Sequence, residues 1–394
     1  MSKSVMLVSS IDYGVQYLLE RITEVLTIYG FDVFKCGKEI IPDCEPDYIL
    51  GIITISYGIG QGELIPRSIT HEEIVSIIRS NKRRWLLVHD NVVFAQCLLS
   101  DLGFDSPEKR KDKLPLKVGA NSITSLQVID VYEEAMKNKD FSAWVHTYHT
   151  NADARLFASA QFYHVQESQV KHYISFDRDN SISDVKITGT EAKAKEKPVV
   201  MVSSPVYGYE DLLERLFDLL SDYGYDVWMS HKGTLPVDSN DDITDNCLNA
   251  VNKCHLFLGI ITPVYGAVEK NKNFSMSHME IQQAIQKNKL RCFLTHDSVA
   301  FAKRLLDDLG YNIPEKRQQL TLKENASSVT DLRVIDMYEE VEIDKLQQKN
   351  TEINASVFYE KFYRFQEAEL YITENLANPD KIIEKYEYLQ GAIK

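Results

Sequence analysis

The chain has 394 residues, of which 44% are hydrophobic and 26% are charged, and its formal net charge is −14. This length is enough for two domains with full-sized cores, and the composition is that of a soluble globular protein. The negative charge argues against a dominant surface for nucleic acid or anionic membranes, because phosphate binding needs clustered Lys and Arg side chains. The negative net charge does not exclude a small, local pocket that binds an anion.

The N-terminal stretch and the cysteines indicate a cytoplasmic protein. No apolar run reaches the ~18 residues that span a bilayer, and MSKSVMLVSS indicates a first strand rather than a signal peptide. None of the six cysteines belongs to a C-x-x-C pair, which predicts a reducing compartment without a disulfide framework. Cys247 and Cys254 share one helical face, which favours core packing over a metal or redox role.

The predicted elements alternate between strands and helices, most clearly in the second half. Short apolar runs predict strands, apolar residues at helical spacing predict helices, and Gly224 suits the position after a helix end. In chain order the predicted elements are strand 198–204, helix 209–224, strand 225–230, helix 243–254, strand 256–262, helix 277–288, strand 290–297, helix 298–310, a fifth strand 332–338 and a helix 353–374. This alternation predicts an α/β fold with a parallel sheet that binds ligands at the carboxyl ends of its strands.

The chain contains the same domain twice. VMLVSSIDYG at 5–14 matches VVMVSSPVYG at 199–208, LGIITISYG at 50–58 matches LGIITPVYG at 258–266, and LQVIDVYEE at 126–134 matches LRVIDMYEE at 332–340. The period of about 200 residues indicates a domain duplication rather than a solenoid. Residues 1–176 are therefore predicted as the first copy, the polar residues 177–198 as a linker, and residues 199–394 as the second copy.

The first copy is shorter than the second in one place. The second copy has 14 more residues between Trp228 and Gly259 than the first copy has between Phe34 and Gly51. The first copy is therefore predicted to lack the counterpart of the helix 243–254. This difference favours the second copy as the active one.

Polar residues gather where the predicted strands end or the next helices begin. Because these ends meet at one edge of a parallel sheet, the residues are predicted to face one crevice in each copy. They are Ser203, Ser204, Tyr207, Gly208, Tyr265, Gly266, Ser275, His278, Glu280 and His296 in the second copy, and Ser9, Ser10, Tyr13, Tyr57, Gly58, Ser68, His71 and Glu73 in the first. The chain has no P-loop, G-x-G-x-x-G, G-x-S-x-G or H-E-x-x-H motif, so ATPase, hydride-transfer, serine-hydrolase and zinc-protease functions have no support.

The spacing around Glu280 allows two interpretations. Ser277-x-x-Glu280, like Thr70-x-x-Glu73, is a capping box, in which the hydroxyl caps the helix and the Glu reaches back to the N–H of the cap residue. The other interpretation is a reactive carboxylate, which the helix dipole keeps ionised and therefore suited to act as a nucleophile. The capping box leaves Ser275 and His278, and their counterparts Ser68 and His71, without a role.

Two further motifs have a functional and a structural interpretation. His296-Asp297 and His89-Asp90 are similar to metal-binding pairs, but each ends a predicted strand and no matching set of histidines follows. A helix-capping Asp beside a crevice histidine is favoured, no metal is expected, and His296 stays a candidate for substrate binding. The basic clusters in IPEKRQQL and SPEKRKDKL indicate solvated loop faces.

The pattern V-S-S-x-x-x-G, L-L-E-R-L, G-I-I-x-x-x-Y-G and S-x-x-x-x-E resembles an uncharacterised domain often found ahead of NACHT and repeat modules. That domain is similar in fold to Toll/interleukin-receptor (TIR) domains and to nucleoside 2-deoxyribosyltransferases. The resemblance covers residues 5–104 and 199–311, and it implies two tandem flavodoxin-like (TIR-like) three-layer domains, each followed by C-terminal helices. Family members often carry an Arg before the Tyr-Gly pair, where this chain has Ser56 and Val264, so any role of that Arg is absent here.

The resemblance also implies a chemistry. In the enzymatic relatives a Glu near the start of the third helix attacks or stabilises the anomeric carbon of a ribosyl group, and Glu280 and Glu73 match that position. Cleavage of an N-glycosidic bond passes through an oxocarbenium-like transition state, which a carboxylate beside the anomeric carbon stabilises or traps covalently. Backbone N–H groups around residues 203–208 are candidates to hold a phosphate or ribose oxygen, and Tyr207 or Tyr265 to stack on a base.

These expectations define two functional hypotheses. The first is an enzyme, a candidate NAD nucleosidase that cleaves NAD or a related nucleotide without a cofactor, with a role in bacterial antiphage defence by analogy. The second is a non-catalytic module that senses a nucleotide or assembles with a protein. The expected partners are a nucleotide-like small molecule and a second copy, as a pseudo-dimer within the chain or a homo-oligomer, and neither nucleic acid nor membrane. An open crevice around Glu280 favours the enzyme, whereas a buried and fully bonded Glu280 favours the module.

Overall fold

The computed structural model describes residues 3–9, 13–35, 46–57, 75, 83–137, 143–167, 197–238, 242–268, 270, 272–349 and 357–392. Contacts divide the chain into two compact units, Met1–Cys97 with Phe104–Ala192 and Leu98–Gly103 with Lys193–Lys394. The first unit contains the first copy of the repeated domain except Leu98–Gly103, and the second unit contains the second copy. Of the predicted linker, only Lys197 and Pro198 belong to the described residues.

The first copy alternates between strands and helices. Within the described residues its elements are β1 (Ser4–Ser9), α1 (Tyr13–Ile28), β2 (Asp32–Lys35), β3 (Tyr48–Ile53), β4 (Arg83–His89), α3 (Asp90–Asp101), α4 (Pro107–Lys113), α5 (Gln127–Lys137), β5 (Ala143–Tyr148) and α6 (Asn151–Glu167). The strands form one parallel sheet in the order β2-β1-β3-β4-β5.

The second copy repeats this plan, and its last two described elements are helices. Its described elements are β6 (Val199–Ser203), α7 (Glu210–Asp222), β7 (Asp226–Trp228), the 3-10 helix η1 (Ser230–Lys232), α8 (Ile243–Lys253), β8 (Leu256–Ile261), α9 (Met276–Gln286), β9 (Arg291–His296), α10 (Asp297–Asp308), α11 (Pro314–Arg317), α12 (Arg333–Lys349), β10 (Val357–Phe362), α13 (Phe365–Leu376) and α14 (Pro379–Ala392). Its parallel sheet has the order β10-β9-β8-β6-β7.

The strand order confirms the predicted fold class of two tandem flavodoxin-like α/β domains. In each sheet the first strand lies between the second and the third, so the chain continues from it first to one side and then to the other. In the second copy this reversal falls between β6 and β8. Ligands bind outside the carboxyl ends of strands at such a reversal, which directs attention to the loops after β6 and β8.

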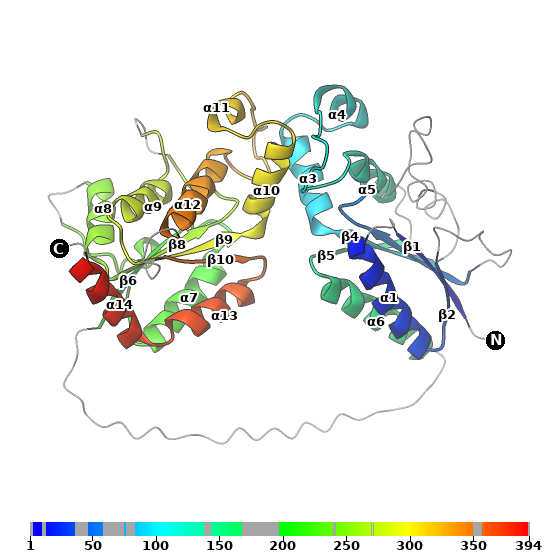
Figure 1. The fold of residues 1–394 in the computed structure, drawn as a ribbon, viewed down its shortest axis with the longest axis horizontal. Coiled ribbons are helices and arrows are strands. Elements are labelled where there is room, and N and C mark those ends of the chain that lie inside the picture. The colour runs from blue at the N-terminus through cyan, green and yellow to red at the C-terminus, as the bar shows by residue number, and fades with distance from the viewer. Residues whose placement is uncertain are drawn as a thin grey trace, which may run out of the picture. The chain divides into compact units, whose positions relative to one another are not determined.

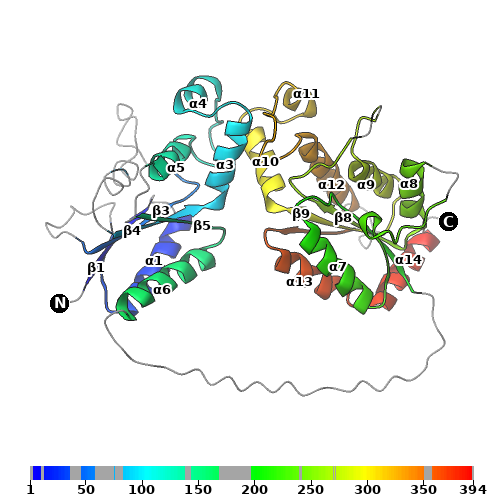
Figure 2. The same cartoon turned by 180° about the vertical axis from the view of Figure 1, so that it is seen from behind.

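Helices cover both faces of the sheet in the second copy (Figures 1 and 2). α7, α13 and α14 lie on one face, and α8, α9, α10 and α12 lie on the other. α7 turns a stripe of leucines toward the sheet and buries it there. As predicted, Gly224 follows this helix in the left-handed conformation (φ 97°), and the N–H of Tyr225 bonds the carbonyl oxygen of Leu220 at 3.1 Å.

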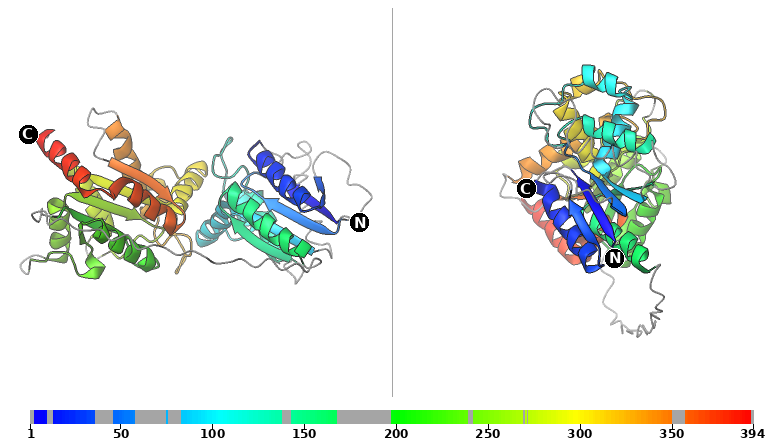
Figure 3. Two further views of the ribbon diagram at one scale, coloured as in Figure 1. Left: turned by 90° about the horizontal axis from the view of Figure 1, so that it is seen from below. Right: turned by 90° about the vertical axis from the view of Figure 1, so that its right-hand side faces the viewer.

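In the first copy, α1 and α6 pack side by side on one face of the sheet and α3 and α5 lie on the other (Figure 1). The left view of Figure 3, seen from below, shows α1 and α6 in front of their strands. Their core centres on Trp85 of β4, whose ring centroid lies 4.8 Å from that of Phe162 on α6. Buried aromatic pairs of this kind dominate the energetics of a core because of their large apolar area.

Two predicted elements at the end of the second copy differ from the structure. Residues 332–338 are predicted as the fifth strand, but all of them except Leu332 belong to the helix α12. The fifth strand is β10, inside the predicted helix 353–374. Only α13 confirms the helical part of that segment. The run LRVIDMY is too short for its apolar pattern to distinguish a buried strand from a helix, and the pairing of β10 with β9 is a long-range contact.

The helix that the first copy is predicted to lack falls on residues outside the described ones. In the second copy, η1 and α8 follow β7. The corresponding residues 36–45 of the first copy are not among those described. The missing helix therefore stays a prediction.

Gly259 in β8 fills a position where any side chain would collide with buried rings. A Cβ atom there would lie 2.9 Å from Cδ1 of Phe293 and 3.1 Å from Cε1 of Phe257, and both phenylalanines are fully buried. Gly259→Ala should therefore lower the unfolding free energy by about 1–3 kcal/mol in urea titrations. Gly391→Ala in α14 is the matched control, because nothing lies within 4 Å of its Cβ position, and it should leave stability unchanged or raise it by up to about 1 kcal/mol. Equal midpoints for the wild type and Gly259→Ala would contradict the packing argument.

Candidate active site

The first turn of α9 begins two residues earlier than the predicted capping box requires. Ser275 is the N-cap, and its hydroxyl accepts the N–H of His278 at 3.4 Å. Glu280 lies beyond the first turn, so the interpretation of Ser277 and Glu280 as a capping box is wrong. The sequence offered two Ser residues at capping distance from a polar side chain, and only the position of the helix start distinguishes them. The corresponding box at Thr70 lies outside the described residues.

Glu280 faces the carboxyl end of β6. Its side chain is buried, with a relative exposure of the residue of 5%, and its Oε2 accepts a hydrogen bond from the Ser203 hydroxyl. Burial raises the pKa of Glu280 to about 7, although hydrogen bonds from Ser203 and from the Cys247 thiol on α8 act in the opposite direction. The expectation that the environment of this carboxyl favours its ionised form is therefore wrong, because desolvation outweighs a helix dipole that acts mainly on the first turn.

Burial of Glu280 should make stability depend on pH in a defined direction. Because its pKa of about 7 in the folded protein exceeds the ordinary 4.5, the folded protein binds more protons than the unfolded chain between these values. This contribution to stability is fully present below pH 4.5 and is lost as the pH rises through 7, about 3 kcal/mol in total. Urea titrations across this range should show the unfolding free energy of the wild type falling relative to that of Glu280→Gln. Parallel pH curves for the two proteins would contradict the buried-carboxyl assignment.

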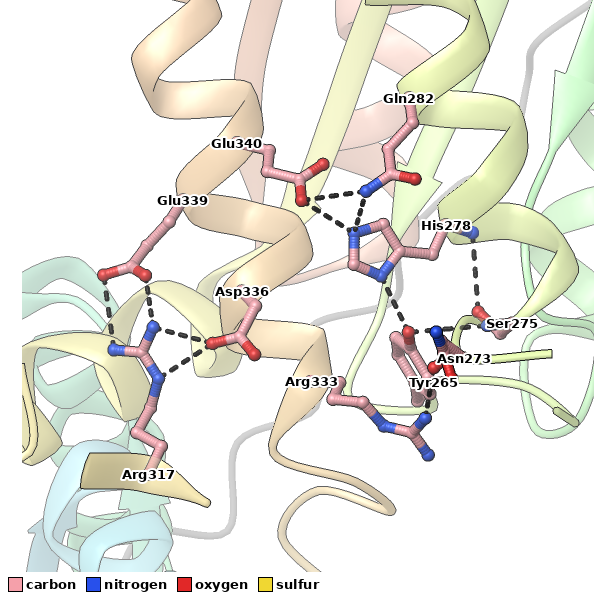
Figure 4. Close-up of polar contacts among 10 residues, drawn as sticks. All are labelled: Tyr265, Asn273, Ser275, His278, Gln282, Arg317, Arg333, Asp336, Glu339 and Glu340. Carbon is pink, nitrogen blue, oxygen red and sulfur yellow. Dashed lines mark hydrogen bonds and ion pairs between the residues drawn. The ribbon is translucent and has the colours of Figure 1, made fainter. Parts of the chain in front are cut away.

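A second group of predicted site residues meets on the other side of α9 (Figure 4). The hydroxyl of Tyr265 lies 2.7 Å from Nδ1 of His278, and the N–H of Ser275 donates to the same hydroxyl at 3.4 Å. Nε2 of His278 lies 3.2 Å from Oε1 of Glu340 on α12. Tyr265 and His278 are buried, so neither presents a surface to solvent.

The loops after β6 and β8 converge at the start of α9. Gly266 adopts a positive φ of 85°, and a Cβ atom there would lie 3.8 Å from Cγ of Pro205 and 3.7 Å from Cβ of Ser275. Ser204 donates through its hydroxyl to the carbonyl oxygen of Pro205 at 2.9 Å. In the same loop Gly208 also has a positive φ, 78°.

Tyr207 differs from the other predicted aromatic residue of the crevice. It is 80% exposed on the loop after β6, whereas Tyr265 is 1% exposed. Of these two candidates for stacking on a base, only Tyr207 offers a free ring face in this structure. A free face is what stacking on a ligand requires.

His296 caps a helix at the end of β9. Its Nδ1 accepts the N–H of Ser298 at 3.2 Å, which makes His296 the N-cap of α10 and Asp297 the first helical residue. The prediction that Asp297 is the cap is therefore wrong by one residue. The imidazole lies among aromatic rings, with centroids 6.1 Å from Tyr209 and 5.3 Å from Phe362.

Only part of the predicted site in the first copy lies among the described residues. Ser9 is buried at the end of β1, in the position of Ser203. The N–H of Tyr57 donates to Oγ1 of Thr124 at 2.8 Å, as that of Tyr265 does to Thr330 at 2.9 Å. The backbone of Tyr13 begins α1. The remaining candidates lie outside the described residues: Ser10, Gly58, Ser68, His71 and Glu73.

In the first copy, the His89-Asp90 pair noted in the sequence gains a third member, His149, which the sequence analysis missed. Oδ1 of Asp90 lies 2.8 Å from Nδ1 of His89, and its Oδ2 lies 2.8 Å from Nδ1 of His149. Burial raises the pKa of Asp90, but the hydrogen bonds from His149 and His89 outweigh it and hold that pKa well below its usual range. His149 follows β5, a strand that the prediction placed elsewhere, so the sequence offered no reason to bring it to this edge.

The basic clusters predicted as solvated loop faces each contain a buried arginine. Arg110 and Arg317 are both 1% exposed. Arg317 forms ion pairs with Asp336, at 2.7 Å, and with Glu339. Arg110 forms the equivalent ion pairs with Asp130 and Glu133. The prediction is wrong for these two residues because carboxylates on α5 and α12 neutralise them. Each arginine lines a cavity, about 720 Å³ beside Arg110 and about 320 Å³ beside Arg317. Glu280 lines neither of these cavities.

Three residues around the site were not predicted to belong to it. Cys247 approaches Glu280 from α8, Glu340 approaches His278 from α12, and Gln282 donates to Oε1 of Glu340 at 3.0 Å. Gln282 follows His278 by four residues, so helical spacing could have placed the two together. Glu340 could not be found because its segment is predicted to begin with a strand.

Neither a metal cluster nor a membrane-spanning helix occurs among the described residues. In that part of the chain, no group of three or more His, Cys, Asp or Glu side chains is placed to hold a metal ion. None of its helices combines the length and apolar character that a bilayer span requires.

The second copy matches a family of unknown function. Residues 199–377 match the model of the family described as "Domain of unknown function (DUF4062)". Among solved structures, the chain is similar to the Clostridium botulinum CMP N-glycosidase BcmB, at 16% identity and a TM-score of 0.25, over 45% of this chain and 99% of that chain. It is also similar to the E. coli RcsC C-terminus, with its linker region and phosphoreceiver domain, at 10% identity and a TM-score of 0.17, over 89% and 96%. No curated protein matches the chain.

The family match confirms the predicted resemblance of the second copy to an uncharacterised domain. The likeness of both copies to TIR domains stays a prediction. The two solved structures are too distant from this chain to bear on its activity.

Proposed function

We propose that the second copy cleaves the N-glycosidic bond of NAD or a related nucleotide, with Glu280 as the reactive carboxyl. The observation that carries this proposal is the position of Glu280, whose carboxyl accepts a hydrogen bond from Ser203 at the carboxyl end of β6, where the strand order reverses. Carboxyls whose pKa is strongly raised at such an edge are typical of functional sites.

The chemistry needs one ionised carboxylate. With a pKa of about 7, a large share of Glu280 is ionised at neutral pH. The carboxylate attacks the anomeric carbon, the carbon–nitrogen bond breaks, and the base leaves with the electron pair. Water then hydrolyses the glycosyl ester, which frees the sugar product, releases one proton and restores the carboxylate. The nicotinamide of NAD leaves as a neutral molecule without a proton donor, so NAD suits a site with a single reactive carboxyl.

The loop after β6 supplies the binding groups in this proposal. Tyr207 stacks on the base through its exposed ring, and the N–H groups of residues 203–208 hold a phosphate or ribose oxygen. Ser203 holds Glu280 in the resting site and releases it when the substrate enters. A role in bacterial antiphage defence rests on the family resemblance alone.

One observation favours a second function, a non-catalytic module that senses a nucleotide or assembles with a protein. Glu280, His278 and Tyr265 are all buried and bonded to other protein groups. A site whose polar groups are already paired gains less from a reacting ligand than an open one. The enzyme therefore requires Glu280 to exchange its bond to Ser203 for substrate, whereas the module does not.

Release of free base by the purified full-length chain distinguishes the two functions. NAD and the 5′-monophosphates of the common nucleosides are incubated with low and high concentrations of protein, and the products are separated by liquid chromatography. Nicotinamide or base release that scales with protein and requires Glu280 supports the enzyme. Nucleotide binding in calorimetry without base release at either concentration supports the sensing module.

A further inference from the structure

The bonds around His278 define one tautomer of its imidazole (Figure 4). The Tyr265 hydroxyl accepts the N–H of Ser275, so its own proton is available to Nδ1 of His278, 2.7 Å away. Nδ1 then acts as the acceptor, and the proton on Nε2 points to Oε1 of Glu340 at 3.2 Å. Burial raises the pKa of Tyr265, which keeps the phenol in this donor form. An imidazole that accepts at Nδ1 and donates from Nε2 thus bonds both Tyr265 and Glu340, and Nε2 of Gln282 lies 3.5 Å from its Nε2.

Tyr265 is itself held in place by the residues before and within α12. Its N–H donates to Oγ1 of Thr330 at 2.9 Å, and the guanidinium of Arg333 lies 4.9 Å from its ring centroid. Arg333 also donates to the carbonyl oxygen of Asn273 at 2.5 Å, two residues before the α9 N-cap. The loop from β8 to α9 is therefore tied at both ends to the segment that begins α12.

His278 and Glu280 project from α9 toward different neighbours. Residues two positions apart on a helix point about 200° apart. His278 contacts Tyr265 and Glu340, whereas Glu280 contacts Ser203 on β6 and Cys247 on α8. A rotation or shift of the α9 start that broke the first set of contacts would also move the carboxyl away from Ser203.

We infer that His278, bonded between Tyr265 and Glu340, is a positioning residue that holds the start of α9 so that Glu280 faces the carboxyl end of β6. The expected effect of His278 on the rate of base release rests on the proposed function. Its effect on the position of Glu280 does not. His278 is fully buried and its two ring nitrogens face Tyr265 and Glu340, so in this inference it acts through Glu280. This positioning role differs from the substrate contact predicted from the sequence.

Two isosteric substitutions separate the bonds of His278. In His278→Asn the amide oxygen takes the place of Nδ1 and still accepts from Tyr265, whereas in His278→Gln the amide nitrogen takes the place of Nε2 and reaches only Glu340. Tyr265→Phe deletes one oxygen and so removes the same bond as His278→Gln, together with the longer bond from the N–H of Ser275. If the Tyr265–His278 bond positions Glu280, His278→Gln and Tyr265→Phe should lower kcat to a similar extent. The double variant should then have a kcat no lower than that of either single variant. His278→Asn, which keeps the bond to Tyr265, should have a kcat close to that of the wild type.

The first measurement is the kinetics of nicotinamide release from NAD by the full-length variants. We expect kcat to fall about 10-fold to 100-fold in His278→Gln and Tyr265→Phe, because a small misplacement of a reacting group has effects of that size. KM should stay within about twofold, since substrate contacts are untouched, and His278→Asn should recover most of the rate. A kcat within about twofold of the wild type in both His278→Gln and Tyr265→Phe overturns the inference.

The second measurement does not need activity. The infrared carbonyl band of protonated Glu280, assigned by its loss in Glu280→Gln, is titrated with pH in each folded variant. In the wild type its midpoint should lie at about 7. In Tyr265→Phe and His278→Gln it should move down by about one pH unit, because a displaced carboxyl gains water. An unchanged midpoint in both variants overturns the inference. If the midpoint shifts in the variants but the wild type does not cleave NAD, the inference is supported and the proposed enzymatic function is rejected.

Discussion

Replacing Glu280 with Gln should lower nicotinamide release from NAD by at least about 100-fold while the protein stays folded. Gln has the size of Glu, and its amide oxygen can still accept a hydrogen bond from the Ser203 hydroxyl. What is lost is the ionised carboxylate, which neither attacks nor stabilises the anomeric carbon once it is an amide. The measurement is kcat for base release by the purified full-length protein, with circular dichroism to confirm the fold.

Glu210→Gln is the matched control for this experiment. Glu210 is an exposed carboxylate in the first turn of α7, so the same chemical change occurs at the same edge of the sheet without touching Glu280. Its kcat should equal that of the wild type. Full activity in Glu280→Gln would reject the assignment of this residue. A residual activity that disappears only when Glu73 is also replaced would assign part of the reaction to the first copy.

Replacing Asp344 with Asn should lower the unfolding free energy of the second copy by about 3–5 kcal/mol. Asp344 and Arg291 form a buried ion pair, with Nε to Oδ2 at 2.7 Å and Nη2 to Oδ1 at 2.5 Å. Arg291 is fully buried, and its remaining donors reach the carbonyl oxygen of Lys289 and Oδ1 of Asn288. Removing the carboxylate leaves a guanidinium charge without compensation in a medium that solvates it poorly. Urea titrations of the wild type and the variant measure the difference.

Two controls separate the buried charge from the loss of a contact. Arg291→Met combined with Asp344→Leu removes both charges and should recover most of the stability, because a packed apolar pair replaces a buried ion pair at little net cost. Glu369→Gln breaks the exposed pair between Glu369 and Arg215 and should change stability by no more than about 1 kcal/mol. A change this small for Asp344→Asn would mean that water reaches Arg291.

Local patterns determined most of the architecture of this chain. Segments that match between the two halves of the chain predicted two copies of one domain. Short apolar runs that alternate with segments of helical spacing predicted parallel sheets. The strand-end rule placed Ser203 and Glu280 at one edge, and the structure joins them by a hydrogen bond. These successes share one reason, which is that burial on both faces of a strand and on one stripe of a helix leaves a short-range periodicity.

The tertiary structure alone decided the features that depend on contacts between distant segments. The fifth strand is β10 because it pairs with β9, and LRVIDMY forms the start of α12 although its short apolar run fits either state. The protonation of Glu280 depends on burial beneath β6 and α8, which outweighs the helix dipole on which the sequence argument relied. His278 turns inward because Tyr265 and Glu340, brought from the β8–α9 loop and from α12, supply partners for both ring nitrogens. Burial and pairing of this kind are properties of the packed protein, so no local pattern of residues encodes them.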